Sequence, residues 1–370
     1  MPATNGHRVW GRLPKLPSSY IGPDLHRHTA PNPLAVLAFL RSEIPTEDIS
    51  ANPVVAHPHN TSRIIPERLP PAKVKELSVL QPAKALIATA GEWAVIAVAI
   101  AVCSYIWHPA LYVIAVMVIG ARQHALLVLG HDATHYRYLR KRWQNDLFGN
   151  LFLMWPTFAS VEAFRKYHGT HHQYTNLAND GNRQLWHTHN AQGEFEPEWV
   201  FPKTRRRLAL MILRRAAFLT GISWVIRGLV GPSFIPQPPW MVAARLAFYT
   251  SVAGMLTYFG AWLGFVWYWL VPFCTWHIAA QYVRLICEHS AVEADEGEYR
   301  ITRTTLPTRL EAAFILPRNI GFHIEHHWYP SIPFYRLPEL HSLLMTRAGF
   351  QTNAVVRRSV VTSLGECVKP

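Results

Sequence analysis

The amino-acid sequence predicts an all-α membrane protein, with four transmembrane helices arranged as two hairpins and a cytoplasmic helical cap that carries clustered histidines. Three observations lead to this prediction. Two long stretches contain no charged residue, basic residues gather outside them, and histidine is concentrated in three short clusters. Within the 370 residues we expect a membrane domain at 76–350, a Pro-rich cytoplasmic arm at 1–75 and a C-terminal tail at 351–370.

The first part of the chain has no pattern of a folded element. It opens "MPATNGHRVWGRLPKLPSSY", which lacks an apolar core after its charges and is therefore not a cleaved signal peptide. Its proline content and lack of periodicity predict an extended or disordered arm. The chain has 4 cysteines, scattered and without a Cys-x-x-Cys pair, which argues against a disulfide framework and a cysteine zinc site.

The first uncharged stretch runs from Trp93 to Ala121 and has His108-Pro109 at its middle. A helix needs about 20 apolar residues to span a bilayer, and this stretch is long enough to contribute to two such helices. We predict spans at 86–107 and 109–130, joined by a very tight turn at Pro109.

The second uncharged stretch runs from Leu246 to Val283. As one helix it would measure roughly 57 Å, which exceeds the bilayer core of about 30 Å. We therefore predict spans at 246–264 and 265–284, with a turn near Gly260 to Gly264. The segment 205–235 alternates apolar turns with arginines, a pattern typical of a helix lying on the membrane surface.

Basic residues set the predicted orientation. "RYLRKRW" follows the first hairpin, "KTRRRLALMILRR" lies in the central segment, and both hairpin turns lack Lys and Arg. The positive-inside rule then places both termini and residues 131–240 in the cytoplasm, at a bacterial inner membrane or the endoplasmic reticulum. The formal net charge of +13 fits a surface near anionic lipid. No nucleic-acid-binding module is recognisable, so nucleic acid is not an expected partner.

The histidines are the strongest sign of chemistry. "HDATH", "HGTHH" and "HIEHH" each place imidazoles at helical positions i, i+3 or i+4, which share one helix face. All three clusters fall outside the predicted spans and on the same predicted side, which scattered surface histidines would not do. His289 is a ninth candidate, because topology brings it to the same side. The nine are His131, His135, His168, His171, His172, His289, His323, His326 and His327.

Clustered neutral imidazoles without thiolates suit zinc, iron, copper or nickel. Eight or more ligands exceed the four or so that zinc takes, whereas two ions of higher coordination number would use them, which favours iron. Nearby carboxylates could fix the histidine tautomers, although each could equally be a solvated charge. These carboxylates are Asp132, Glu162, Asp180, Glu288 and Glu325.

Four basic side chains near the clusters admit two interpretations. They could receive an anionic head group or the surface of an electron donor, or they could simply lie at the membrane interface. They are Arg122, Arg165, Lys166 and Arg318.

The pattern HxxxH, HxxHH, HxxHH, with hydrophobic hairpins between, resembles the membrane fatty acid desaturase and hydroxylase superfamily from about residue 85 to 350. "FRKYHGTHHQYTNLAND" and "RNIGFHIEHHWYPSIPFYRLPELH" are similar to its second and third histidine boxes. The resemblance implies a non-haem centre of two Fe ions held by the nine histidines, with O2 as co-substrate. It also implies two electrons from an external ferredoxin, rubredoxin or cytochrome b5 type donor.

The resemblance leaves several reactions open. The simplest expectation is a fatty acid desaturase that oxidises a C–H bond of an acyl chain or another lipid. A lipid hydroxylase, a carotenoid-type ketolase and a decarboxylase that forms a 1-alkene are alternatives on the same scaffold. A zinc-dependent membrane hydrolase is a distant alternative, with fewer ligands and an acid/base carboxylate. A metal transporter should instead place histidines along a path within its spans.

Overall fold

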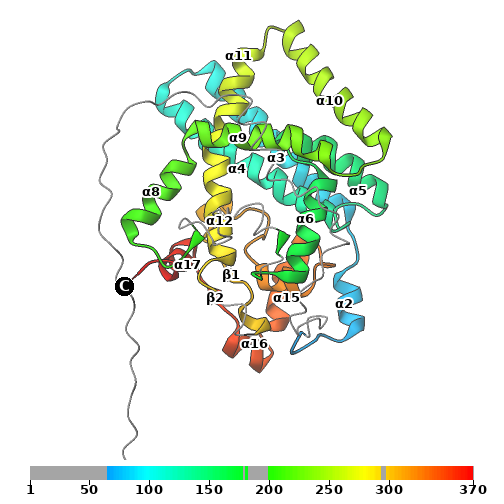
Figure 1. The fold of residues 1–370 in the computed structure, drawn as a ribbon, viewed down its shortest axis with the longest axis vertical. Coiled ribbons are helices and arrows are strands. Elements are labelled where there is room, and N and C mark those ends of the chain that lie inside the picture. Colours follow the sequence, from blue (N-terminus) through cyan, green and yellow to red (C-terminus); the bar gives the residue numbers. More distant parts are fainter. Residues whose placement is uncertain (1–64, 178–179, 182–198, 293–296, 370) are drawn as a thin grey trace, which may run out of the picture. The chain divides into compact units, whose positions relative to one another are not determined.

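The computed structural model describes residues 65–177, 180–181, 199–292 and 297–369 (Figure 1). Residues 1–60 and 61–370 form two separate units, and the structural account below concerns the second. The predicted arm lies outside the described residues up to position 64.

Within the described residues, three helices are long and apolar enough to cross a membrane. The first two are α3 (Pro82–Tyr105) and α4 (Pro109–Thr134), which pack against each other and overlap the predicted spans 86–107 and 109–130. Each begins with proline, whose fixed φ and missing N–H suit the first turn of a helix. The turn between them spans only residues 106–108.

The third apolar helix runs from Trp262 to His289. It consists of α11 (Trp262–Phe265), the π-helical segments η5 (Val266–Leu270) and η6 (Phe273–His277), and α12 (Ile278–His289). Pro272 has no N–H to donate, which explains why regular α-helical bonding is interrupted here.

Helix α4 and segment η6 come into backbone contact at Gly120. A Cβ atom at this position would lie 2.7 Å from Trp276 Cβ and 2.8 Å from the Pro272 carbonyl oxygen. Only glycine allows the two helices to approach this closely.

The helix that lies at the predicted third span, 246–264, is offset from it. The helix in this region, α10 (Pro239–Tyr258), starts earlier and ends earlier, and it is not among the three apolar helices. The turn falls at residues 259–261, where Gly260 adopts a φ of +62°. Proline before and at the start of α10 explains the early start, and glycine at the turn explains the early end.

The predicted surface helix is two helices, α8 (Arg205–Arg215) and α9 (Phe218–Val230). Together, α8 and the segment to Ser233 are long and apolar enough to count as a fourth crossing, but they bend by 57° between the two parts. Leu208 and Met211 of α8 pack on Tyr282 and Ile286 of α12.

The remaining elements surround the end of the apolar helices that carries the histidines (Figure 1). Before α8 they are α2 (Pro71–Leu77), α5 (Arg142–Gly149), η1 (Asn150–Met154), η2 (Trp155–Thr157) and α6 (Val161–Tyr174). After α9 they are η4 (Gly231–Phe234), η8 (Glu298–Arg300), β1 (Thr304–Thr305), α13 (Arg309–Phe314), α14 (His323–Trp328), η9 (Phe334–Arg336), α15 (Leu337–Leu344), α16 (Ala348–Asn353), β2 (Val356–Arg357) and α17 (Val360–Glu366). Strands β1 and β2 pair in parallel, with Thr304 opposite Val356.

Segments from both ends of the described chain pack onto the histidine-bearing part. Leu69 and Leu77 join the apolar cluster that contains Ile324 and Trp328 of α14. Cys367, just after α17, joins the cluster that contains Ile286 of α12. Residues 69–75 and 351–369 therefore pack as parts of the fold around the histidines.

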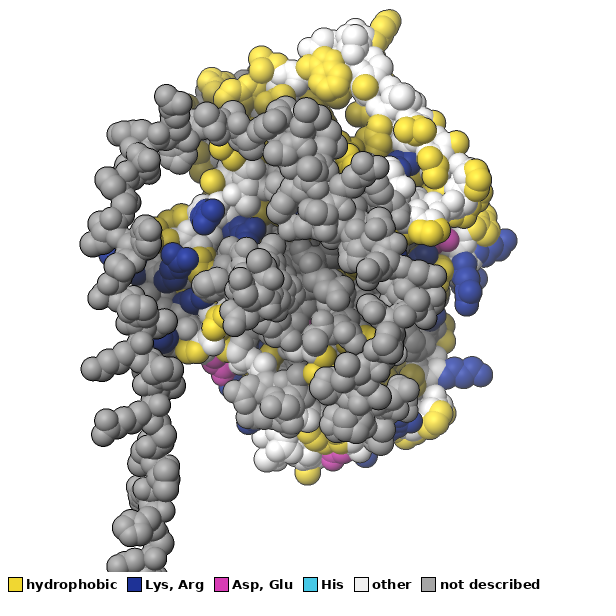
Figure 2. All heavy atoms as spheres, in the orientation of Figure 1, with side chains coloured by type: hydrophobic (Ala, Val, Ile, Leu, Met, Phe, Trp, Pro, Cys, Tyr) yellow, Lys and Arg dark blue, Asp and Glu magenta, His cyan; other side chains and the backbone are white. Residues whose placement is uncertain are grey.

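The opposite ends of the apolar helices are rich in exposed aromatic side chains. Tyr105 and Trp107 flank the turn after α3, and Tyr258 and Phe259 flank the turn after α10; all four are exposed. Hydrophobic side chains also cover α10 in Figure 2. Exposed apolar surface bordered by aromatic rings is typical of a helix bundle in lipid.

Candidate metal centre

The structure brings the nine predicted histidines together in two groups. In each group the candidate ligand atoms all lie within 4.8 Å of one another. The five-histidine group contains His131, His135, His168, His172 and His326, and the four-histidine group contains His171, His289, His323 and His327.

The two groups divide the histidine clusters of the sequence. His131 and His135 come from the end of α4, and His289 is the last residue of α12. Helices α6 and α14 each contribute to both groups. On α6, His172 lies about 40° from His168 around the helix axis, and both belong to the five-histidine group. His171 lies about 60° from His168 in the opposite direction and belongs to the four-histidine group.

The imidazoles of each cluster share one helix face, yet those of α6 and α14 are divided between the two groups. On α14, His323 and His327 share the four-histidine group, while His326 belongs to the five-histidine group. The i, i+4 pairs stay together and the remaining histidine points to the neighbouring group, because i+3 and i+4 lie on opposite sides of position i.

The ring nitrogens in the five-histidine group are very close. His168 Nε2 lies 2.8 Å from His131 Nε2 and 3.0 Å from His172 Nε2. His172 Nε2 also lies 2.9 Å from His326 Nε2. A neutral imidazole carries one N–H, so these converging nitrogens cannot all be paired by hydrogen bonds while each ring also keeps an N–H at Nδ1.

The four-histidine group has the same character. His323 Nε2 lies 2.9 Å from His289 Nε2 and 3.2 Å from His327 Nε2. Inward-facing Nε2 lone pairs at these distances would repel one another unless a cation lies between them. The donor chemistry of both groups therefore fits a metal ion that prefers imidazole.

Burial keeps these imidazoles neutral. It lowers the pKa of His135 to about 3, and it lowers the pKa of His168, His326 and His327 well below the usual 6.5. The neighbouring histidines and arginines lower these pKa values further. Neutral imidazole is the form that binds a metal, so the environment prepares the rings for ligation at neutral pH.

Two polar contacts orient histidines of the four-histidine group. His171 Nδ1 lies 2.8 Å from Asp180 Oδ1, and both side chains are buried. The Thr175 hydroxyl donates to the His171 carbonyl and lies 3.1 Å from His327 Nδ1, so it can accept the N–H of that ring. Both contacts place the N–H at Nδ1 and leave Nε2 facing the group.

The other predicted carboxylates differ in their positions. Glu288 Oε1 lies 3.5 Å from His323 Nδ1 and 2.7 Å from Arg284 Nε. Asp132 Oδ1 lies 3.7 Å from His131 Nδ1, and its other oxygen accepts from the Phe334 N–H. These two carboxylates adjoin one group each.

Glu325 and Glu162 make their contacts elsewhere. Glu325 accepts from Thr304 and pairs with His341 on α15, because adjacent helical residues point about 100° apart. Glu162 accepts from Asn150 and Ser160 at the start of α6. Each therefore supports a helix that carries histidines, without orienting one of the nine rings in the observed contacts.

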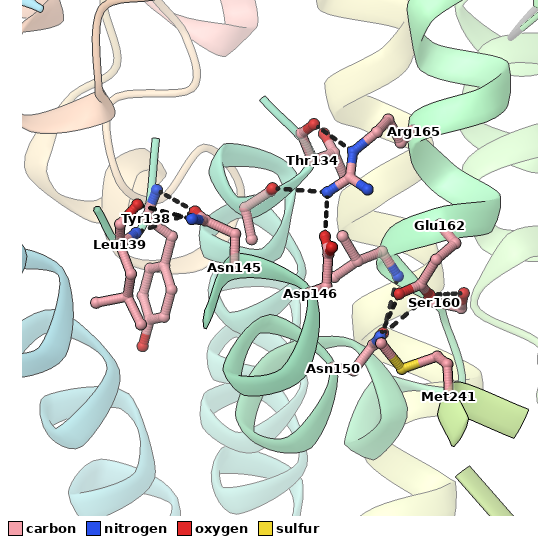
Figure 3. A network of polar contacts seen from close by, with 12 residues as sticks. Thr134, Tyr138, Leu139, Asn145, Asp146, Asn150, Ser160, Glu162, Arg165 and Met241 are labelled. Atoms are coloured by element: carbon pink, nitrogen blue, oxygen red, sulfur yellow. Dashed lines mark hydrogen bonds and ion pairs between the residues drawn. The ribbon is translucent and has the colours of Figure 1, made fainter. Parts of the chain in front are cut away.

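Arg165 connects the first two histidine clusters (Figure 3). From α6 it donates to the carbonyl oxygens of Thr134 and Ala133 at the end of α4, and it pairs with Asp146 at 2.6 Å. Its guanidinium also lies 4.0 Å from the centre of the Tyr136 ring. The cation stabilises the carboxyl end of α4 and fixes the position of α6.

The other two arginines that could receive a head group or an electron donor also form ion pairs within the fold. Arg122 and Arg318 both pair with Glu92 of α3, whose side chain is 1% exposed. Arg318 also donates to the Ala88 carbonyl. These arginines join α3 and α4 to the loop before α14. Lys166 is exposed on α6.

Thr175 and Arg284 are site residues that the sequence reasoning missed. A signal existed for each: Thr175 lies four residues after His171, and Arg284 lies four residues before Glu288. His124 and His277 lie outside both groups, with ring centres 5.8 Å apart in the interior of the bundle. Both side chains are buried.

A family model described as fatty acid desaturase matches residues 106–358 of the sequence, which include both histidine groups. The chain belongs to the fatty acid desaturase family. It is therefore an oxidoreductase of the desaturase type, and the resemblance found in the histidine boxes is confirmed. The three mostly apolar helices fit the membrane association of this family.

Curated relatives of this desaturase-family chain are 23–29% identical to it over the aligned residues. It is 26% identical to an sn-1 oleoyl-lipid 12-desaturase of Anabaena variabilis, over 62% of this chain and 67% of the relative. It is 29% identical to a dihydrorhizobitoxine desaturase of Bradyrhizobium elkanii, over 75% of this chain and 80% of the relative. It is 23% identical to an sn-1 acyl-lipid omega-3 desaturase (ferredoxin) of a Nostoc strain, over 64% of this chain and 68% of the relative.

Proposed function

We propose that this chain is a membrane di-iron oxidoreductase that uses O2 and two external electrons to oxidise a C–H bond of a fatty acyl chain or another lipid. The simplest reaction of this type is fatty acid desaturation. The observation that carries the proposal is the pair of adjoining histidine groups, of five and four imidazoles. Two of the relatives cited above are named acyl-lipid or oleoyl-lipid desaturases, which supports an acyl-lipid substrate.

The number of ring nitrogens favours two ions of higher coordination number, because nine imidazoles exceed the four or so ligands that zinc takes. The closest Nε2 pairs are 2.8 to 3.2 Å apart. Ligand numbers of five and four also suit ions that keep a position for another molecule.

Bound iron would supply the redox chemistry with O2 that an unactivated C–H bond requires. The five-histidine group would hold one ion and the four-histidine group the other. Asp180 and Thr175 hold the protons of His171 and His327 at Nδ1, which would leave their Nε2 atoms available to a bound ion. The low exposure of His131, His168, His171 and His323 keeps bulk water from these rings.

The same proposal includes a membrane topology. His131 and His289 lie at the histidine-bearing ends of two apolar helices, and exposed aromatic residues border the opposite ends. The basic sequences after the first hairpin and in α8 favour a cytoplasmic position for the histidine-bearing end. The reducing electrons would then come from a cytoplasmic carrier of the ferredoxin, rubredoxin or cytochrome b5 type.

Metal analysis of detergent-purified protein tests the di-iron assignment. We expect about two irons per chain, with His326→Ala and His323→Ala each lowering the content toward one by disabling a different group. His108→Asn replaces an exposed histidine at the opposite end of α4 and should retain the metal. One zinc and no iron after growth in iron-rich medium would contradict the oxygenase mechanism and favour a hydrolase. If iron is present, product analysis with reduced ferredoxin and acyl lipids would identify the oxidised bond.

A further inference from the structure

One basic surface of the molecule is not explained by the metal groups. It consists of Arg205, Arg206 and Arg207 at the start of α8, with Lys203 just before them and Lys369 beside Lys203. The arginines and Lys369 are exposed. We call these five residues the α8 basic surface, and Figure 2 shows Lys and Arg side chains over the part of the molecule where Figure 1 places α8.

Within the part of the chain that the structure describes, the three arginines at the start of α8 form no ion pair. The described stretch from Trp199 to Trp240 contains no Asp or Glu, whereas Glu194, Glu196 and Glu198 precede it in the sequence. Glu366, at the end of the adjacent α17, already pairs with both Arg303 and Arg357. Clustered cations of this kind attract an acidic surface and increase the rate at which it associates.

A short path of bonded atoms leads from the α8 basic surface to the four-histidine group. The Lys203 N–H donates to the Cys367 carbonyl at 2.8 Å. The Cys367 thiol contacts the Ser290 carbonyl at 3.7 Å, and Ser290 is covalently joined to His289. Arg303, which pairs with Glu366, also donates to the carbonyls of Cys287 and Ser290. These contacts connect the α8 basic surface to His289 through Cys367 and Ser290.

We propose that the α8 basic surface docks an acidic one-electron carrier protein and that electrons enter at the four-histidine group through Cys367, Ser290 and His289. This inference rests on the proposed function, which requires an external donor. Each docked carrier loses one electron, so two successive dockings supply the two electrons. With two protons from solvent and two hydrogens from the substrate, they reduce O2 to two waters.

An anionic membrane surface could also attract these cations, but two observations favour a protein partner. The bonded path runs from Lys203 to His289 rather than to an apolar face. Lys203 and Lys369 are also tied to the C-terminal segment beside α17, rather than to the exposed aromatic ends of the apolar helices.

The test measures binding of an oxidised plant-type [2Fe–2S] ferredoxin, and of cytochrome b5, to full-length protein in nanodiscs of neutral lipid. The test variant is R205Q/R206Q/R207Q, and the matched control is R140Q/K141Q/R142Q, which removes three exposed cations elsewhere. We expect the test variant to weaken carrier binding about tenfold or more and to flatten its salt dependence. The control should bind within about twofold of wild type.

Three outcomes would overturn the docking proposal. They are equal carrier binding by the test variant and wild type, a loss confined to the control, and failure of wild type to bind either carrier at low salt. A difference between wild type and the test variant that requires anionic lipid in the nanodisc would instead assign the surface to the membrane.

A second measurement separates this inference from the proposed function. Substrate oxidation driven by reduced methyl viologen bypasses a docking surface, so the test variant should match wild type in this assay while its KM for ferredoxin rises. Loss of viologen-driven activity in the test variant would contradict a docking role. Absence of activity with every reductant, together with normal carrier binding, would contradict the proposed function and leave the docking surface in place.

Discussion

His171 Nδ1 lies 2.8 Å from Asp180 Oδ1, and neither side chain is more than 2% exposed. The carboxylate therefore holds the proton on Nδ1 and leaves the Nε2 lone pair for the four-histidine group. We expect Asp180→Ala to weaken metal affinity about 10- to 100-fold. Metal titration of the purified protein would measure this. Glu339→Gln, at a partly exposed ion pair with Arg336, provides the control, and unchanged affinity in Asp180→Ala would refute the orienting role.

Arg165 should be needed for the relative positions of α4 and α6. Its replacement by Gln removes a cation that donates to the Thr134 and Ala133 carbonyls and pairs with Asp146. We expect a loss of about 2–3 kcal/mol of stability, because charged hydrogen bonds are lost from a partly buried site. Thermal unfolding in detergent would report the loss.

The neighbouring Lys166→Gln is a matched control for Arg165, because it removes the same charge from an exposed position on the same helix. Arg165→Lys should recover only part of the stability, since an ammonium group cannot reproduce the planar set of donors. Equal melting temperatures for Arg165→Gln and Lys166→Gln would show that the contacts of Arg165 contribute nothing to stability.

Glu92 should be a key residue for joining α3 to the rest of the fold. Its carboxylate is 1% exposed and pairs with Arg122 at 2.9 Å and with Arg318. Glu92→Gln leaves two partly buried guanidinium groups without their counter-ion, so we expect a loss of about 3 kcal/mol. Glu76→Gln breaks an exposed pair with Lys73 and should cost less than about 1 kcal/mol. Similar unfolding of the two variants would contradict the structural role of Glu92.

The metal-free protein should lose stability in mild acid. Burial lowers the pKa of His135 to about 3 in the folded chain, compared with 6.5 for the unfolded chain. Between these values the unfolded chain binds the extra proton, so stability falls as the pH decreases from 6.5 toward 3. Each such histidine contributes up to about 1.4 kcal/mol per pH unit.

Denaturant unfolding of the metal-free protein at pH 7, 6 and 5 would measure this dependence. His135→Gln should reduce its slope, because one titrating group has been removed. A pH dependence of stability in His135→Gln equal to that of wild type would show that protonation of His135 carries no cost.

The nine histidines could be predicted from sequence because their spacing is a local property of a helix. Their division between two groups could not, because it depends on the directions from which α4, α6, α12 and α14 approach. Glu325 illustrates the same limit: it neighbours His326 in sequence, yet it contacts His341. The first hairpin was predictable because Pro109 interrupts a long apolar stretch, whereas uncharged residues gave no comparable signal for where α10 begins.

The separation of His171 from His168 and His172 has a consequence for how this protein can change. Helices α6 and α14 each contribute histidines to both groups, so a movement of either helix shifts ligands of both groups. Helices α4 and α12 each contribute to only one group. A one-residue insertion between His168 and His171 would rotate the following rings by about 100° and damage both groups. Substitutions that alter the surroundings of one histidine group are therefore best tolerated at the ends of α4 and α12, because they leave the other group unchanged.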